Sequence, residues 1–380
     1  MQGSGQETAG GKGFDMREWL QPKRLTLAMW DHAYLTRHVA GDAFEDYDKV
    51  LDEAAERGYN TLRLDPLPHV IDLSRPEVVY RQADTKRPYL PWSRPGGFEG
   101  PAGAWLIEMV EKLRARKLNY TLSAWWPTGI EPAVSEPRTL ADAAELWASM
   151  LRQWKKRFGF EGLAYVDLNN EFPCFLADQW EEMEKRSGPM HSPAWQQLAT
   201  AVINMAMDRM RDEFPELLFT VSLHGDLPHC GMPVELDCLD IHFYSDADPR
   251  WTKRTRFDRY LPDLFTKTDW RKDFSSRCGS ARAAAGMYRA RQRAKAEAFA
   301  QWGRRRGMPL TASGGWSSQY YIDSPEMDWT WLLEWAEWSV EDAIDLGLWG
   351  WSPHNYVQPQ FANWKDIGWH QELTARFLQG

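Results

Sequence analysis

The sequence predicts an α/β fold and, within that class, a single-domain (β/α)8 TIM barrel with elaborated βα loops. Its 380 residues are 43% hydrophobic, which can bury one large core at a length that such barrels often reach. Short apolar runs alternate with segments of helical periodicity, which gives eight strand–helix units without an internal sequence repeat. We expect residues 1–23 to form a flexible tail and residues 24–380 to form the barrel domain.

The expected strands are short apolar runs, most of which end in polar residues. They cover 25–30, 60–64, 118–124, 163–168, 217–223, 236–243, 308–312 and 346–351. The expected helices repeat apolar residues every three or four positions and cover 42–58, 106–113, 139–154, 195–214, 281–305, 328–345 and 369–378. Two long segments, 73–100 and 245–278, are expected to be irregular walls of a cleft.

Three of the expected helices begin with a capping signal. Thr139 with Asp142 forms a capping-box pattern, and Ser192 directly precedes a proline in the first helical turn. Asp42 with Glu45 resembles a second capping box. These signals predict where the helices start.

Composition and charge restrict the partners. The formal net charge of -9 and the pI near 5.6 argue against a nucleic-acid partner, which needs a concentrated basic surface. Residues 1–14 are polar and Gly-rich, which predicts neither a signal peptide nor a membrane span. We therefore expect no membrane partner, and a location in the cytoplasm or, after removal of a signal peptide, outside the cell. No pattern predicts an oligomeric state.

Twenty-two tryptophans are more than one core usually takes. Aromatic faces stack on sugar rings, so a carbohydrate-binding cleft is one explanation, and ordinary core packing is the other. We expect most of them to be core. Trp125 and Trp126 end the third strand. There they could form a platform for a sugar ring or, equally well, fill the top layer of the barrel. The cysteines lack Cys-x-x-Cys spacing and no His-x-His pair occurs, so neither a metal nor a cofactor is expected.

The strongest catalytic candidate follows the fourth strand. The run 163–168 ends abruptly in Asn169, Asn170 and Glu171, so a carboxylate stands at the end of a buried strand. In an α/β barrel the loops at the carboxyl ends of the strands surround the ligand-binding mouth. Glu171 is therefore expected to be catalytic, with Asn170 binding a sugar hydroxyl or orienting the carboxylate. The alternative is a loop carboxylate that only caps a neighbouring group.

Side chains at other strand ends are expected at the same mouth. Arg63 lies within an apolar strand, where an unpaired guanidinium is costly to bury, so it should face a carboxylate or an anion. His242 and Tyr244 share one face of the sixth strand by alternation. Further candidates for substrate contacts are Asp31, His32, Asp65, His69, Trp125, His224, Trp316, Trp351, His354 and Asn355.

The order of these motifs resembles clan A of the retaining glycoside hydrolases. Asn-Glu ends the fourth strand, Arg lies in the second, His-x-Tyr ends the sixth and Trp ends the eighth. More narrowly, nearly the whole chain from residue 25 resembles the cellulase-like family. The segments that carry this likeness are Met29-Trp30-Asp31, Arg63-Leu64-Asp65, the Asn-Glu pair, the Trp316 segment and the closing run from Asn363 to Gln371.

The resemblance implies that Glu171 is the general acid/base and that a second glutamate, the nucleophile, ends the seventh strand. In this sequence Gly314 occupies that position. A retaining glycosidase uses two carboxyl groups about 5 Å apart, one to protonate the leaving oxygen and one to attack the anomeric carbon. Because glycine cannot attack, the chain as written is expected to lose nearly all hydrolysis of β-linked oligo- and polysaccharides.

The resemblance also implies roles for other residues of the mouth. Arg63 and Tyr244 would orient the missing carboxylate, and Asn170 would contact the 2-hydroxyl of the sugar. Trp351 would form the floor of the subsite for the cleaved sugar. Neither a metal nor a cofactor takes part in this chemistry.

Three interpretations of Gly314 remain open. In the preferred one, it is an engineered replacement for Glu that traps a substrate or permits synthesis from glycosyl fluorides. In the second, the chain is a natural pseudoenzyme that binds a glycan without cleaving it. In the third, another carboxylate acts in an inverting or relocated mechanism, with the carboxyl groups about 6.5 to 9.5 Å apart. The candidates for that carboxylate are Asp31, Asp65, Asp226 and Asp246.

Overall fold

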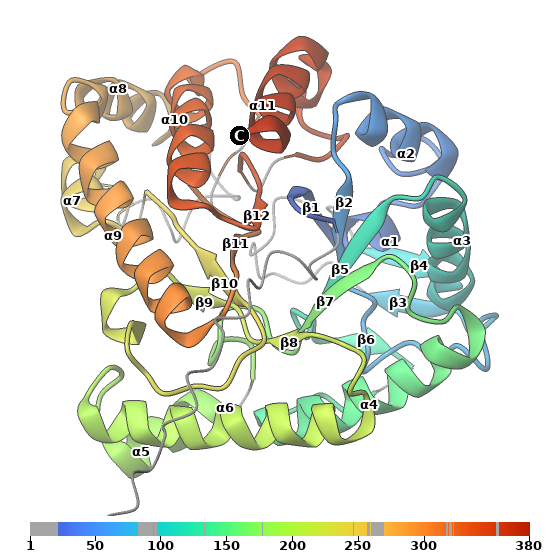
Figure 1. Ribbon diagram of the computed structural model, residues 1–380. Coiled ribbons are helices and arrows are strands. Elements are labelled where there is room, and N and C mark those ends of the chain that lie inside the picture. Colours follow the sequence, from blue (N-terminus) through green and yellow to red (C-terminus); the bar gives the residue numbers. More distant parts are fainter. Residues whose placement is uncertain are drawn as a thin grey trace, which may run out of the picture.

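The computed structural model is a ring of strands surrounded by helices (Figure 1). It describes residues 22–380 apart from 83–93, 95–96, 133, 177, 246, 257–258, 260–269, 317, 319–320, 322 and 355–356. Tyr89 and Trp92 of the expected cleft wall lie outside the described residues, as do Asp246 and Asn355. No helix of the described part of the chain is long and apolar enough to span a bilayer.

The central sheet closes on itself. Its hydrogen-bonded order is β8-β7-β5-β2-β1-β12-β11-β10-β9, and every pairing in it is parallel. The strands are β1 (Leu25–Asp31), β2 (Thr61–Leu64), β5 (Asn119–Ser123), β7 (Leu163–Asp167), β8 (Phe219–Thr220), β9 (Leu223–His224), β10 (Leu239–His242), β11 (Leu310–Ala312) and β12 (Gly350–Trp351).

The fifth barrel strand is the one that closes the ring. Its first part, β8, pairs with β7 through Phe219 and Val166, and its second part, β9, pairs with β10 through Leu223 and Ile241. Only two residues separate the two parts, so they act as one interrupted strand. The predicted (β/α)8 barrel is therefore confirmed, with all eight strands in the expected places.

Long helices cover the outside of the barrel (Figure 1). They are α2 (Tyr47–Glu56), α3 (Ala102–Ala115), α4 (Leu140–Arg157), α6 (Pro193–Glu213), α9 (Ala285–Arg306), α10 (Thr330–Leu346) and α11 (Ile367–Gln379). The seven predicted helices are thus present. Shorter helices are α1 (Ala33–Thr36) and α5 (Gln179–Ser187), and the 3-10 helices are η1 (Leu227–His229) and η4 (Ala362–Lys365).

Two of the three predicted caps are confirmed. Thr139 and Asp142 form a reciprocal capping box, and the Ser192 side chain accepts a hydrogen bond from a backbone N–H of α6. The prediction at Asp42 is wrong. Helix α2 starts later, with Asp46 as its cap, because the Asp46 carboxylate accepts the backbone N–H of the residue three positions on.

The two segments expected to be irregular contain regular structure. In the first, β3 (Tyr80–Gln82) pairs antiparallel with β4 (Phe98–Gly100) and with β6 (Ile130–Glu131). The second contains α7 (Pro249–Thr255) and α8 (Trp270–Arg282). Helix α8 buries Trp270, Phe274 and Cys278 at four-residue spacing, which is a helical pattern that the sequence analysis did not use.

Alternation along the strands separates two layers inside the barrel. Leu25, Leu27, Tyr165, Cys238 and Trp349 form an apolar cluster towards the amino ends of the strands. Two residues further along the strands, at their carboxyl ends, charged and polar side chains face one another. Among the residues that the structure describes, nine tryptophans are fully buried, namely Trp30, Trp147, Trp154, Trp195, Trp251, Trp302, Trp331, Trp351 and Trp364.

Candidate active site

Glu171 lies just beyond β7 and is held by the neighbouring strand. Its backbone N–H donates to the Ser222 hydroxyl at 2.9 Å, and the next residue donates to the Ser222 carbonyl at 2.9 Å. The residue adopts φ of 55°, a left-handed conformation that is uncommon for a non-glycine residue and is often found at functional sites. The Glu171 residue is 5% exposed, so it lies at the edge of the mouth.

Two imidazoles bind the Glu171 carboxylate. His242 Nδ1 lies 3.0 Å from Oε1, and His224 Nε2 lies 3.3 Å from Oε2. Burial alone would raise the pKa of Glu171, but the charges and hydrogen bonds of the two histidines outweigh burial and hold this pKa well below its usual value. Conversely, burial would lower the pKa of His224, but Glu171 raises it well above its usual value.

Arg63 is the centre of the floor of the mouth. Its NH2 group donates to the Ser123 hydroxyl at 2.8 Å and to Asn170 Oδ1 at 2.5 Å. Two buried carboxylates, Asp31 and Asp167, each lie 3.5 Å from the guanidinium. Burial raises the pKa of both acids, and the Arg63 charge opposes this rise. Arg63 therefore faces buried carboxylates, as its place in an apolar strand predicted.

The side chains of Asp65 and His69 form hydrogen bonds with backbone groups around the mouth. Asp65 accepts the backbone N–H groups of Leu67 at 2.8 Å and Trp125 at 2.9 Å, and burial raises its pKa to about 7. The His69 ring contacts the carbonyl of Pro127 at 2.9 Å, and burial lowers its pKa to about 4. Both side chains thus position loops, which is a different role from the expected contact with substrate.

His32 and Trp125 are both buried near strand ends. His32 is the residue that precedes α1, and burial lowers the pKa of its imidazole to about 4. The Trp125 ring packs against Phe175 with centroids 5.0 Å apart. Phe175 is 41% exposed and has φ of 67°. The pair forms an aromatic ledge beside Glu171, and Phe175 is a residue that the sequence analysis missed.

The seventh-strand side of the mouth contains no carboxylate between Ser313 and Trp316. Gly315 has φ of 110°, and a Cβ there would lie 2.5 Å from a backbone atom of Phe243, so this position requires glycine. Gly314 is buried beside it and contributes no side chain. Trp316 is buried, with φ of 72°, and its ring packs against Phe243 at 5.1 Å. The Trp316 ring is therefore part of the packing of this loop.

Two expected contacts at the eighth strand are misplaced. Trp351 is fully buried, donates its indole N–H to Ser339 of α10 at 2.8 Å and packs against Phe377 of α11. It lies on the outer face of β12, so the expectation that it floors the sugar subsite is wrong. His354 is also fully buried and contacts Asn363 at 2.6 Å, away from Glu171. Alternation explains the error, because Gly350 occupies the inward position.

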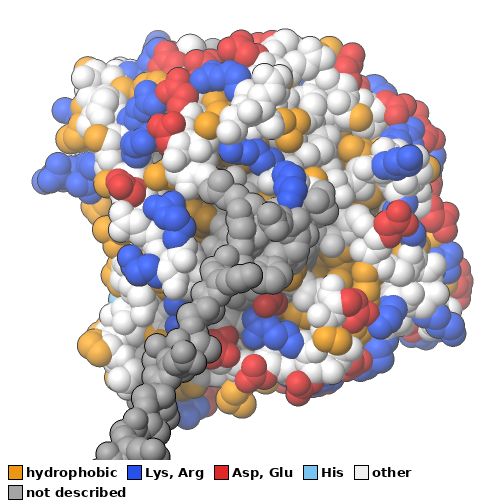
Figure 2. Space-filling view, in the orientation of Figure 1, with side chains coloured by type: hydrophobic (Ala, Val, Ile, Leu, Met, Phe, Trp, Pro, Cys, Tyr) orange, Lys and Arg blue, Asp and Glu red, His pale blue; other side chains and the backbone are white. Residues whose placement is uncertain are grey.

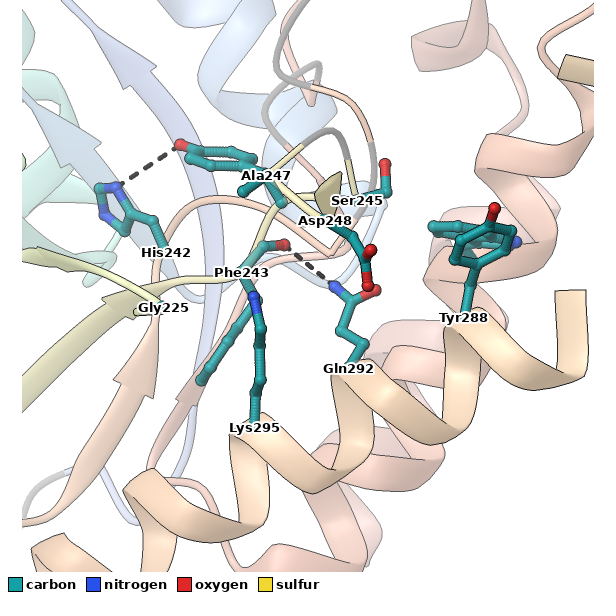
Figure 3. Close-up of a pocket in the computed structure, with 11 residues that line it drawn as sticks. Gly225, His242, Phe243, Ser245, Ala247, Asp248, Tyr288, Gln292 and Lys295 are labelled. Atoms are coloured by element: carbon teal, nitrogen blue, oxygen red, sulfur yellow. Dashed lines mark hydrogen bonds between the residues drawn. The ribbon is translucent and has the colours of Figure 1, made fainter. Parts of the chain in front are cut away.

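Behind β10, a small pocket adjoins the site. His242 lines it from β10, and Tyr288, Gln292 and Lys295 line it from α9 (Figure 3). Gln292 donates to the Phe243 carbonyl at 3.0 Å. The hydroxyl of Tyr244 lies 3.5 Å from His242 Nδ1, so His242 and Tyr244 connect this pocket with Glu171.

Four more residues of the site were missed by the sequence analysis. Asp167 and Asp240 are buried two positions before Asn169 and His242, and Ser222 lies two positions before His224. The fourth, Ser313, directly follows β11. Polar residues repeating at every second position of an apolar strand were the signal that could have found them.

The described residues contain no cluster of three or more His, Cys, Asp or Glu side chains that could hold a metal ion. Around the face in Figure 2, Lys and Arg side chains alternate with Asp and Glu side chains. The coloured part of this face therefore has no broad basic area of the kind that binds a phosphate backbone.

Comparison with family models gives one match, which spans residues 27–378 and is described as sugar-binding cellulase-like. The chain belongs to the cellulase-like family. The predicted family resemblance is thus confirmed, and its glycoside hydrolase type of fold agrees with the barrel. No curated protein matches the sequence.

Solved structures show the same fold. A candidate glycoside hydrolase from Parabacteroides distasonis is 24% identical with a TM-score of 0.77, and the match covers 93% of each chain. The catalytic domain of the major endoglucanase from Xanthomonas campestris is 13% identical with a TM-score of 0.50, covering 93% of this chain and 95% of that one. Cellulose synthase subunit Z from Clostridioides difficile is 10% identical with a TM-score of 0.50, covering 93% and 100%.

Proposed function

We propose that this chain has the site of a retaining glycoside hydrolase for a β-linked oligo- or polysaccharide. Glu171 is its acid/base, and Gly314 stands where the nucleophile would be. The chain as written is then nearly inactive in hydrolysis. The observation that carries this proposal is the Glu171 carboxylate, held at the carboxyl end of the fourth barrel strand by two imidazoles.

The floor of the mouth supports a sugar ligand. Arg63 can only donate, so its bond to Asn170 Oδ1 fixes the Asn170 amide with its NH2 group on the other side. This buried Nδ2 atom has no hydrogen-bond partner among the described residues. Because buried donors are nearly always paired, a sugar hydroxyl beside Glu171 is a suitable acceptor. This is the contact to the 2-hydroxyl that the family likeness implies.

The nucleophile position explains the state of Glu171. In a retaining site the second carboxylate raises the pKa of the acid by like-charge repulsion. Here only histidines lower the pKa of Glu171, and none of the causes of its shift is a neighbouring carboxylate. Glu171 is therefore ionised at neutral pH. We prefer an engineered origin for Gly314, since Glu to Gly vacates space for fluoride or another small anion on the nucleophile face.

Hydrolysis of a panel of activated aryl β-glycosides tests the proposal. The chain as written is compared with Gly314→Glu, which restores a carboxylate, and with Gly314→Gln, which has the same size without the charge. We expect hydrolysis, with retention at the anomeric carbon, only in the Glu form, and its loss when Glu171→Gln is added. Inversion by the chain as written would instead support the third interpretation, in which another carboxylate acts.

A natural glycan-binding pseudoenzyme is the second candidate. It is favoured by the combination of a complete polar floor with a missing nucleophile. This alternative would be supported by two results together. A folded Gly314→Glu variant would hydrolyse no glycoside of the panel, and the chain as written would bind oligosaccharides in titration calorimetry.

A further inference from the structure

A chain of four buried side chains leads away from Glu171 into the barrel. At its inner end, Asp240 accepts the Ser313 backbone N–H at 3.0 Å and the Ser313 hydroxyl at 2.7 Å. The Tyr165 hydroxyl also donates to Asp240 at 2.9 Å. Burial would raise the pKa of Asp240, but His242, Arg63 and these bonds lower it, so Asp240 is a carboxylate that can only accept.

The bond to Asp240 fixes the protonation of the next atom. Ser313 has one hydroxyl hydrogen, and the carboxylate at 2.7 Å takes it. The Ser313 oxygen can therefore only accept from His242 Nε2, which lies 3.2 Å away. His242 consequently carries a hydrogen on Nε2, and its tautomer is set by a neighbour on the seventh strand.

The other ring nitrogen then has a single way to contact Glu171. In a neutral ring with hydrogen on Nε2, the Nδ1 lone pair would face the Glu171 carboxylate at 3.0 Å, which is repulsive. One proton must therefore lie between Nδ1 and Oε1. Because the two histidines hold the pKa of Glu171 well below its usual value, the resting pair is imidazolium and carboxylate, and it contains the proton that an acid catalyst needs.

We infer that His242 stores the acid proton of Glu171, and that Ser313 holds the imidazole in the tautomer this requires. The inference rests on the proposed role of Glu171. His242 is a positioning residue that acts through Glu171. The step moves one proton from Nδ1 to Oε1, converts the ion pair into a neutral pair, and makes or breaks no other bond.

Charged and polar groups face His242 from its own strand and from the opposite strands. On its own strand, Asp240 lies 3.9 Å from Nε2 and the Tyr244 hydroxyl lies 3.5 Å from Nδ1. From the opposite strands, Asp31 attracts a proton on the imidazole, whereas the Arg63 guanidinium repels it. His224 competes for the same carboxylate through Oε2, and its side chain is 26% exposed, whereas that of His242 is fully buried.

Nitrogen-15 NMR of the histidine-labelled full chain tests the inference, with His242→Asn used for assignment. At pH 7 we expect both ring nitrogens of His242 to be protonated, and Glu171→Gln should convert the ring to the neutral form with hydrogen on Nε2. In the Glu171→Gln background, Ser313→Ala should move the hydrogen of the neutral ring from Nε2 to Nδ1, because the acceptor that fixes the Nε2 hydrogen is lost. An unprotonated Nδ1 at pH 7 in the unmodified chain would overturn the inference without any variant.

Matched variants separate this role from simple packing. Ser313→Thr keeps the hydroxyl and should keep the hydrogen on Nε2, whereas Ser339→Ala removes a buried serine behind Trp351 and should leave the tautomer of His242 unchanged. In the Gly314→Glu background, Ser313→Ala should shift the basic limb of the pH–rate profile with little change in KM. If His242 is protonated but the Gly314→Glu variant hydrolyses nothing, only the proposed function is contradicted. If that variant hydrolyses glycosides and His242 is neutral, only this inference is contradicted.

Discussion

The two sides of the barrel mouth differ in the polar side chains that their strand ends carry. On the side of β7, β9 and β10, the Glu171 carboxylate is bound by two imidazoles and anchored to the next strand through Ser222. On the side of β11 and β12, a Ser-Gly-Gly turn offers no carboxylate, and Trp351 faces the outer helices. In terms of the proposed function, the acid half of the site has its side chains, whereas the nucleophile half has only its backbone.

This difference shows that the two halves depend on different forces. The acid half is held by side-chain hydrogen bonds between neighbouring strands, so each residue supports another. The turn at Gly315 is fixed by the close approach of the Phe243 backbone and not by a side chain at 314. A carboxylate at 314 can therefore be absent while the rest of the mouth keeps its shape.

The largest expected effect is rescue of the empty half by a small anion. Azide or formate should raise the rate at which the chain as written cleaves the aryl glycoside identified by the panel, by about a thousandfold. The physical reason is that the anion attacks from the space that a Glu side chain would fill. Gly314→Gln fills this space and should not respond. Absence of rescue, with Gly314→Glu active, would show that the space is not accessible.

The next largest effect is expected when the positive charge of Arg63, which lies between the two halves, is removed. Arg63→Met should lower the free energy of unfolding by about 3 to 5 kcal/mol, because Asp31 and Asp167 lose their buried counter-charge. Denaturant unfolding measures this, with Arg75→Met as the control. Arg75 pairs with Asp72 at the surface, where its side chain is 67% exposed, so its loss should cost no more than about 0.5 kcal/mol.

Filling the nucleophile position should also change the acid across the mouth. Gly314→Glu should raise the pKa of Glu171 by about one to two units, through like-charge repulsion. In the chain as written this pKa is depressed, so Glu171 stabilises the fold above about pH 4.5, and that stability is lost as the pH falls through its folded-state pKa. In the variant the loss should occur at higher pH. Carbon-13 NMR of labelled glutamate measures the shift, and an unchanged pKa would place the two carboxyls too far apart for retention.

The smallest expected effect concerns the two tryptophans assigned to the mouth. Trp351→Phe should cost about 1 to 2 kcal/mol of stability through its lost hydrogen bond and packing, and should leave glycan affinity unchanged. Trp125→Phe, at the ledge with Phe175, should weaken binding instead. Titration calorimetry beside denaturant unfolding separates the two. Lower affinity in Trp351→Phe would return this residue to the sugar subsite.

Strand positions were predictable because each barrel strand is a short apolar run that ends in polar residues. Arg63 and Glu171 stood out for a physical reason, since a charge next to a buried strand needs a partner or a function. The antiparallel strands β3, β4 and β6 were missed because each is two or three residues long and is defined only by pairing with distant segments. Helix α8 was missed although Trp270, Phe274 and Cys278 recur at helical spacing, because most of the residues between them are polar.

By itself, the sequence determined the order of the barrel units, the strand end that carries Glu171, and the glycine at the expected nucleophile position, because these depend on local pattern and residue identity. Only the tertiary structure decided which side chains meet. The inward or outward direction of Trp351 depends on the pleat of β12, and the contact of His242 with both Glu171 and Ser313 joins strands about seventy residues apart. Such contacts arise when parallel strands close into a ring, which no local pattern encodes.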